Sequence, residues 1–366
     1  MDFEFPEDSL MLRDMLRKFL QKDARPLEMK YFNAGKLEPE EQARLRSAIE
    51  QMGLWAATVP EKFGGGGLDC VTACLIEEEL GATFVPIELG DVPPLLLECS
   101  PEQSPRYLEP VVAGERLPVF AAREPGVIRP EGWRTSAAVD GDGYRLQGVK
   151  VLAARPPDKA FYIVLAKAPE GLTAFVLEKE HAGLSLRGNG QPTLVLEDCR
   201  VDRSAVLGKP GHALASSTDE ASRAWIRWGA RYVGMAQRLM EMAAEHAKDW
   251  VSLGEPLAVR PAMRRMLAEI SVDVESARWL VYHAAWSADH GQNLRASAAK
   301  VRLGTGEMLL RVIDRVTMVF CGPGPAPAIT PQRMVRSLVP PEALELALEY
   351  ARSAVAAEVL AAAGER

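Results

Sequence analysis

Residues that could do chemistry gather toward the end of the chain. The segment Phe320–Arg336, FCGPGPAPAITPQRMVR, joins glycines, prolines and one cysteine in a turn between helical stretches. Beyond it, PPEALELALEYARSAVAAEVL reads as a helix with proline at its start, and it carries Glu342, Glu345 and Glu349. A partly buried carboxylate of this kind can remove a proton, because burial raises its pKa. The same glutamates can instead form a solvated helix face that pairs with Arg352. Both interpretations are open at this point.

The elements that must position these residues are long helices. Lengths of this kind suit a four-helix bundle in which the helices also meet other subunits. We therefore predict a C-terminal bundle domain over 216–366 and an oligomer, with helices at Asp219–Leu253, Pro256–His290, Arg295–Phe320 and Pro340–Ala363.

The first part of the chain also reads as helical, and we predict an N-terminal α-helical domain over 1–116. Asp8 or Ser9 is expected to cap the first helix, and Pro26 to close it. The apolar periodicity predicts helices at Leu10–Gln21, Glu38–Met52, Cys70–Leu80 and Arg106–Ala113.

Between the helical regions, short β-prone runs alternate with Gly, Pro and Asp turns. This spacing predicts a middle antiparallel β-sheet domain over 117–215. The fold class is thus α+β. The predicted strands are Val119–Ala122, Ala137–Val139, Tyr144–Leu152, Phe161–Ala166, Thr173–Leu177 and Thr193–Leu196.

Composition excludes several classes of function. The chain has 366 residues and a net charge of −7, which argues against nucleic acid as the main partner. Its five cysteines do not make a disulfide framework, and no Cys/His set has zinc spacing, so no metal site is expected. No export signal and no apolar run long enough to span a bilayer is visible. We expect a cytoplasmic protein with no membrane partner.

Five local strings, in order, resemble the acyl-CoA dehydrogenase family along nearly the whole chain. The first, Phe3–Pro26, resembles the family's opening helix. GLWAATVPEKFGGGGLD, followed by Glu77–Gly81, is similar to its P-E-x-x-G-G-x-G-L and E-E-L-G signature. The other three are GDGYRLQGVK at Gly141–Lys150, LEDCRVDRSAVLG at Leu196–Gly208 and RRMLAEISVDVESARWLVYHAAW in the bundle. In addition to the five strings, the turn at Phe320–Arg336 resembles the family's Q-x-x-G-G-x-G pattern.

The resemblance implies α,β-dehydrogenation of an acyl-CoA thioester. A carboxylate takes the α-proton, FAD takes the β-hydride, and an electron-transferring flavoprotein reoxidises the flavin. The family register puts Glu345 at the position of the catalytic carboxylate. It puts the cofactor-binding positions at Ala122, Arg123, Glu124, Ala154, Trp250, Gly322 and Gly324.

The departures from the family pattern fall on these flavin positions. The family's T-E-P is Arg123-Glu124-Pro125 here, and the hydroxyl expected after the hairpin lysine is replaced by Ala154. The family's phosphate-reaching Arg is Trp250. The Gln and first Gly of its glycine motif are Met318 and Cys321. Each lost hydrogen bond costs about 0.5–1.5 kcal/mol, so together the losses weaken flavin binding by orders of magnitude.

We therefore predict a subunit of an FAD-dependent acyl-CoA dehydrogenase, with the flavin site shared with or supplied by a homologous chain in a heterotetramer. Fatty-acid or sterol side-chain β-oxidation is the expected setting. The alternatives are a complete homotetrameric enzyme, in which Arg123 and backbone groups replace the lost contacts, and a redox-silent structural or CoA-ester-binding subunit.

Overall fold

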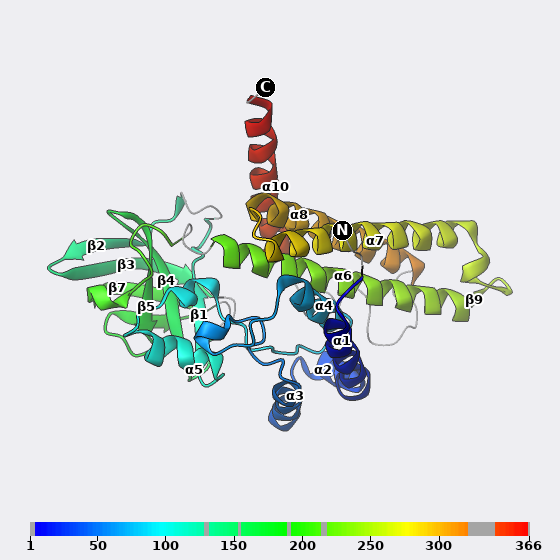
Figure 1. Ribbon diagram of the computed structural model, residues 1–366, viewed down its shortest axis with the longest axis horizontal. Helices are drawn as coiled ribbons and strands as arrows, with labels where there is room; N and C mark the ends of the chain where they lie inside the picture. Colours follow the sequence, from blue (N-terminus) through cyan, green and yellow to red (C-terminus); the bar gives the residue numbers. More distant parts are fainter. Residues whose placement is uncertain are drawn as a thin grey trace. The chain divides into compact units, whose positions relative to one another are not determined.

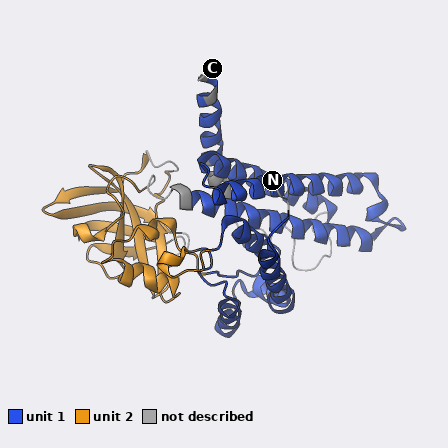
Figure 2. Ribbon diagram, viewed as in Figure 1, with its two compact units in different colours: residues 1–58, 68–89, 221–366 blue, residues 59–67, 90–220 orange. Residues whose placement is uncertain are grey.

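The computed structural model describes residues 4–127, 132–152, 155–188, 192–213, 218–320 and 341–364. The chain divides into two compact units (Figure 2). The first contains residues 1–58, 68–89 and 221–366, and the second contains residues 59–67 and 90–220. The N-terminal and C-terminal helices thus belong to one unit, whereas our sequence division gave each its own domain.

The first unit is helical (Figure 1). Its N-terminal part contains α1 (Glu7–Phe19), the short turns η1 (Leu20–Ala24) and η2 (Arg25–Leu27), α2 (Glu28–Ala34), α3 (Pro39–Gln51) and α4 (Cys70–Gly81). Its C-terminal part contains α6 (Thr218–Asp249), the strand pair β9 (Val251–Ser252) and β10 (Glu255–Pro256), η8 (Leu257–Val259), α7 (Pro261–Asp289), α8 (Arg295–Val319) and α10 (Pro341–Gly364). Buried side chains from α4, α6, α7 and α8 form one apolar core.

The helical predictions hold, with two local corrections in the first unit. The first helix begins directly after Pro6, so Asp8 and Ser9 lie inside it and cap nothing. The Ser9 hydroxyl instead lies 2.7 Å from the Thr72 hydroxyl of α4. Pro26 does not end the helical path either, because proline is tolerated at the first positions of a new turn, here η2.

The hairpin between α6 and α7 corrects two predicted boundaries. The sixth helix ends at Asp249, before the predicted Leu253, and α7 begins at Pro261, after the predicted Pro256. Leu253 has a left-handed φ of 56°, which no helix accommodates. Pro256 pairs with Val251 across the β9–β10 ladder.

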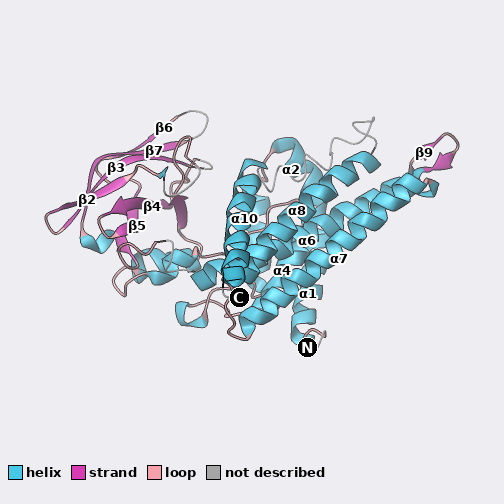
Figure 3. Ribbon diagram, turned by 90° about the horizontal axis from the view of Figure 1, so that it is seen from above, coloured by secondary structure: helices cyan, strands magenta, loops and turns pink. Residues whose placement is uncertain are grey.

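The second unit is built on a sheet of eight strands, flanked by the short helical segments η3 (Glu61–Phe63), η4 (Pro94–Glu98), η5 (Ser104–Leu108), α5 (Glu109–Val112) and η7 (Arg203–Ala205). The strands are β1 (Leu117–Ala121), β2 (Ser136–Asp140), β3 (Gly143–Val151), β4 (Ala160–Ala168), β5 (Gly171–Glu178), β6 (Leu184–Arg187), β7 (Thr193–Val201) and β8 (Val206–Leu207) (Figure 3). Strands β6 and β8 were missed in the sequence.

The sheet is antiparallel in most of its pairings, as predicted, and two pairings differ. Its order is β6-β7-β3-β2-β4-β5-β8, and both β1 and β2 run parallel to β4. Parallel neighbours need a long connection, which the stretch between β1 and β4 provides by carrying the β2–β3 hairpin. This arrangement leaves the residues after β1 next to the end of β3.

Candidate functional site

The segment that follows β1 holds three of the predicted cofactor-binding residues. Ala122 is half-buried, Arg123 is exposed and Glu124 is buried. The Ala122 carbonyl accepts a hydrogen bond from Nζ of Lys150 at 2.9 Å. The Arg123 carbonyl accepts one from the Val151 N–H at 2.9 Å. Residues at the end of β3 therefore hold the segment by hydrogen bonds to its backbone carbonyls. The Arg123 side chain takes no part in these bonds and is exposed to solvent.

Glu124 and Lys150 form a buried ion pair. Their Oε1 and Nζ atoms lie 2.9 Å apart, and the two side chains are 5% and 0% exposed. Nζ also lies 4.6 Å from the centre of the Trp133 ring. A buried charge of this kind persists only when it is paired and hydrogen-bonded, so each partner depends on the other.

Three groups donate hydrogen bonds to the Glu124 carboxylate. Besides Lys150, the Thr135 N–H donates to Oε1 at 2.9 Å and the Arg134 N–H donates to Oε2 at 2.6 Å. Burial alone would raise the pKa of Glu124, but the hydrogen bonds from Thr135, Arg134 and Lys150 outweigh burial and lower that pKa to about 2. Burial lowers the pKa of Lys150, against the attraction of Glu124. Glu124 is thus an ionised structural anchor.

Trp250, the fourth described position, lies at the end of α6 in the other unit. Its side chain is 41% exposed. The ring stacks on His246 with centroids 5.5 Å apart, and His246 stacks on Phe320 at 4.3 Å. Burial lowers the pKa of His246. An indole beside a neutral imidazole offers no positive charge to a phosphate group.

The remaining predicted residues are less fully described. Ala154, Gly322, Gly324 and Cys321 lie outside the described residues. Glu345 lies on α10, and its side chain is outside the described part of the chain. Met318 of α8 is described and 62% exposed. The role of Glu345 as a base therefore stays a prediction.

Few side-chain groups at the four described positions are free to bind a ligand. The Glu124 oxygens are engaged within the β unit, and Trp250 supplies no cation. Arg123 is the one charged side chain among them that faces solvent. Of the described departures from the family pattern, Trp250 lacks a positive charge that the family has, whereas Arg123 adds one.

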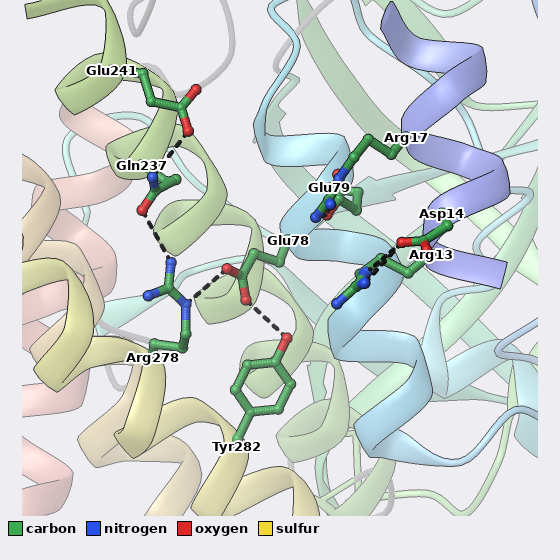
Figure 4. A network of polar contacts seen from close by, with 9 residues as sticks. All are labelled: Arg13, Asp14, Arg17, Glu78, Glu79, Gln237, Glu241, Arg278 and Tyr282. Carbon is green, nitrogen blue, oxygen red and sulfur yellow. Dashed lines mark hydrogen bonds and ion pairs between the residues drawn. The ribbon is translucent and has the colours of Figure 1, made fainter. Parts of the chain in front are cut away.

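Sequence reasoning missed what the glutamates of α4 do. Glu77, Glu78 and Glu79 are consecutive, and each pairs with an arginine on a different helix (Figure 4 shows the last two). Glu77 binds Arg231 of α6 at 2.6 Å, Glu78 binds Arg278 of α7 at 2.9 Å, and Glu79 binds Arg17 of α1. Three successive carboxylates in an otherwise apolar helix were the available signal, because buried acids need partners.

The glutamates of α4 act together with a close backbone contact between α4 and α6. A Cβ atom at Gly234 would overlap the Glu78 carbonyl oxygen, and one at Gly81 would overlap the Arg231 carbonyl oxygen. The Tyr282 hydroxyl donates to the second Glu78 oxygen at 2.8 Å, and burial raises the pKa of Tyr282. These contacts fix α4 against the bundle. They give α4 a structural role and no catalytic one.

The described residues show neither a metal centre nor a membrane span. No group of three or more His, Cys, Asp or Glu side chains within 4–127, 132–152, 155–188, 192–213, 218–320 and 341–364 could hold a metal ion. Among those residues, no helix is long and apolar enough to cross a membrane.

Comparison with known proteins gives the family. The model of the acyl-CoA dehydrogenase N-terminal domain matches residues 6–115, and that of the C-terminal domain matches residues 211–360. The chain is 31% identical to (R)-benzylsuccinyl-CoA dehydrogenase of Thauera aromatica, with 88% of each chain covered. It is 26% identical to the human mitochondrial short-chain specific acyl-CoA dehydrogenase, covering 98% of this chain and 91% of that one.

Among solved structures, butyryl-CoA dehydrogenase of Megasphaera elsdenii superposes with a TM-score of 0.82 at 24% identity, over 98% of this chain and 100% of that one. The fold is therefore that of acyl-CoA dehydrogenases. With two family models that together match most of its length, this chain belongs to the acyl-CoA dehydrogenase family, whose members are FAD-dependent oxidoreductases.

Proposed function

We propose that this chain is a subunit of an FAD-dependent acyl-CoA dehydrogenase that introduces an α,β double bond into an acyl-CoA thioester. Its flavin site is shared with, or supplied by, a homologous partner chain in a heterotetramer. An electron-transferring flavoprotein is the expected electron acceptor. Family membership supports the reaction class. The proposal of a partner chain rests on which residues occupy the site.

One observation carries the shared-site proposal. At the described position where the family resemblance places a phosphate-binding arginine, this chain carries Trp250, whose ring stacks on His246. Replacing a charged donor by an indole removes a hydrogen bond worth about 1.5–3 kcal/mol, which is roughly one to two orders of magnitude in affinity. A homologous chain with arginine at this position would restore this contact.

Glu345 is the proposed α-proton base. The carboxylate chemistry needs a raised pKa, which the neighbouring leucines of α10 would supply by burial. Leu348, one turn away on the same helix, is 1% exposed, so this stretch of α10 does pack against the protein. The runner-up is that Glu345 is a surface residue and the base belongs to the partner chain.

Turnover of acyl-CoA substrates tests this function. The chain is purified alone and with its homologous partner, and reduction of a dye by acyl-CoA is measured for each preparation. We expect activity in the complex only. Turnover by the chain alone would identify a complete homotetrameric enzyme instead. No turnover in either preparation, across short, branched and aromatic acyl-CoA substrates, would contradict the dehydrogenase assignment.

A Glu345→Gln variant of the complex separates the two assignments of the base. If Glu345 is the base, turnover falls by roughly three orders of magnitude, equivalent to about 4 kcal/mol, while flavin content is unchanged. Glu349→Gln, on the same helix and exposed, is the matched control and should retain activity. Full activity of Glu345→Gln would place the base on the partner chain.

A further inference from the structure

Lys150 holds the backbone of the segment after β1 as well as the charge of Glu124. Its ammonium group donates to the Ala122 carbonyl and to the Glu124 carboxylate, and each oxygen lies 2.9 Å from Nζ. The Lys150 side chain is fully buried, and its Nζ lies over the Trp133 ring. A buried ammonium group needs these acceptors, because no water replaces them. Lys150 therefore fixes one particular carbonyl group in addition to a neighbouring carboxylate.

The direction of the Ala122 carbonyl also sets the direction of the N–H group that follows it. In a trans peptide, the C=O and the next N–H lie in one plane and point in opposite directions. No peptide bond between described residues is cis. Because the Ala122 carbonyl points toward Nζ of Lys150, the Arg123 N–H points away from the buried ion pair.

The Arg123 N–H is a backbone donor that the β unit does not use. The ladder between β1 and β4 ends at Ala121, two residues earlier. The Arg123 N–H donates to no described residue, and the Arg123 side chain is exposed. The Arg123 carbonyl, by contrast, accepts a hydrogen bond from the Val151 N–H at 2.9 Å. The carbonyls on both sides of this N–H are thus tied to β3, while the N–H itself is left for a ligand.

We propose that Lys150 is a positioning residue for flavin binding. By holding the Ala122 carbonyl inward, it keeps the Arg123 N–H directed outward as a donor for a carbonyl oxygen of the flavin ring. A donor whose direction is already fixed loses little conformational freedom when it binds an acceptor, so the fixed segment favours binding. The inference rests on the proposed function, because it takes residues 122–124 of this chain as part of the shared flavin site.

The test needs a variant that removes Lys150 without leaving a buried charge. In Glu124→Leu with Lys150→Met both charges are gone, so the β unit should stay folded while the Ala122 carbonyl loses its donor. If melting shows that this double variant is unfolded, Glu124→Gln with Lys150→Met replaces it, because glutamine keeps an oxygen for the Thr135 N–H. Lys179→Met is the matched control, since its partner Asp158 is exposed and it has no contact with the segment.

Hydrogen–deuterium exchange measures the position of the segment without any flavin, in the full-length chain purified alone. The reporter is the Val151 N–H, because it donates to the Arg123 carbonyl and belongs to neither substituted residue. If Lys150 holds the segment, this amide should exchange roughly tenfold faster in the double variant, through more frequent local opening. Lys179→Met should leave its exchange unchanged. Unchanged exchange in the double variant would overturn the positioning role.

The FAD affinity of the complex with the homologous partner shows whether this position matters for the flavin. We expect the double-variant complex to bind FAD roughly tenfold more weakly than the parent complex, because one hydrogen bond is misdirected. The Lys179→Met complex should bind FAD as the parent does. Equal FAD affinity of the double variant would make Lys150 a purely structural residue and overturn the inference. A parent complex that binds no FAD would instead contradict the proposed function, and the inference with it.

Discussion

The ion pairs of the two units differ in where their charges lie. In the helical unit, the three glutamates of α4 pair with arginines that are 19–47% exposed, so water shares these charges. In the β unit, the Glu124–Lys150 pair is almost wholly removed from water. The first arrangement ties α4 to three other helices. The second fixes the single segment Ala122–Glu124, on which the family resemblance places flavin contacts.

The comparison of the two units shows that ion pairs serve two purposes in this protein. Partly exposed pairs add little free energy of folding but favour one arrangement of neighbouring helices. A buried pair adds little stability over an apolar pair, yet breaking it leaves an uncompensated charge and is strongly destabilising. The β unit should therefore be far more sensitive to the loss of one charge than the helical unit.

The largest expected effect comes from Lys150→Met. It leaves the Glu124 carboxylate buried without its cation, so the free energy of unfolding should fall by about 3–5 kcal/mol. Urea unfolding followed by circular dichroism measures this loss. Lys179→Met is the matched control, because it breaks a lysine–aspartate pair of the same 2.9 Å length with the exposed Asp158, and it should change stability very little.

A double variant, Glu124→Leu with Lys150→Met, sharpens this test. Replacing a buried pair by apolar side chains of similar size is often neutral or stabilising, so it should recover most of the lost stability. If the double variant were as unstable as the single one, the loss would come from packing and not from an unpaired charge.

The pH dependence of the β unit is the next effect in size. The pKa of Glu124 is lowered from its ordinary value of 4.5 to about 2. A lowered carboxyl pKa stabilises the folded protein above the unfolded-state value, and the contribution is lost as the pH falls through the folded-state value. Acid should thus remove up to about 3 kcal/mol between pH 4.5 and 2.

Glu124→Gln removes this titration and isolates its contribution. The difference in unfolding free energy between the parent and this variant should shrink as the pH falls across that range. Glu197→Gln, at an exposed position on β7 of the same unit, provides the control. If the difference in unfolding free energy stays constant with pH, the neighbours of Glu124 do not lower its pKa.

The stability of the helical unit should depend more on the close fit of its helices than on its charged pairs. Gly234→Ala places a methyl group against the Glu78 carbonyl oxygen, where backbone on both sides prevents relief. We expect a loss of about 1–3 kcal/mol despite the better helix propensity of alanine. At Gly304 of α8 the nearest atom is the flexible Leu280 Cδ2 at 2.8 Å, so Gly304→Ala should cost less. Equal effects in thermal unfolding would contradict this account.

The smallest effect is expected for Arg17→Met, which breaks the pair with Glu79. Because the Arg17 side chain is 47% exposed, its loss should cost about 0.5 kcal/mol or less. Chemical denaturation of this variant beside Lys150→Met compares the two units directly. A loss as large as that of Lys150→Met would remove the distinction between exposed and buried pairs.

Sequence patterns predicted the long helices and most strands because apolar periodicity records which face each element buries. They missed the parallel pairings of β1 and β2 with β4, which depend on a connection that carries its own hairpin. They also missed the early end of α6, because a leucine at a left-handed φ leaves no compositional sign.

The site was less predictable than the fold. Glu124 and Lys150 both belong to family-like strings, but their pairing across 26 residues follows only from the β1–β3 geometry. The arginine partners of the α4 glutamates are up to 200 residues away in sequence.

The flavin content of the chain purified alone tests the central claim most directly. We predict that the protein purified alone contains far less than one FAD per chain, and that co-purification with its homologous partner brings bound FAD toward stoichiometry. Trp250→Arg combined with Cys321→Gly should raise the FAD content of the lone chain. Near-stoichiometric FAD in the unmodified lone chain, released on denaturation and measured by absorbance, would contradict a shared or supplied flavin site.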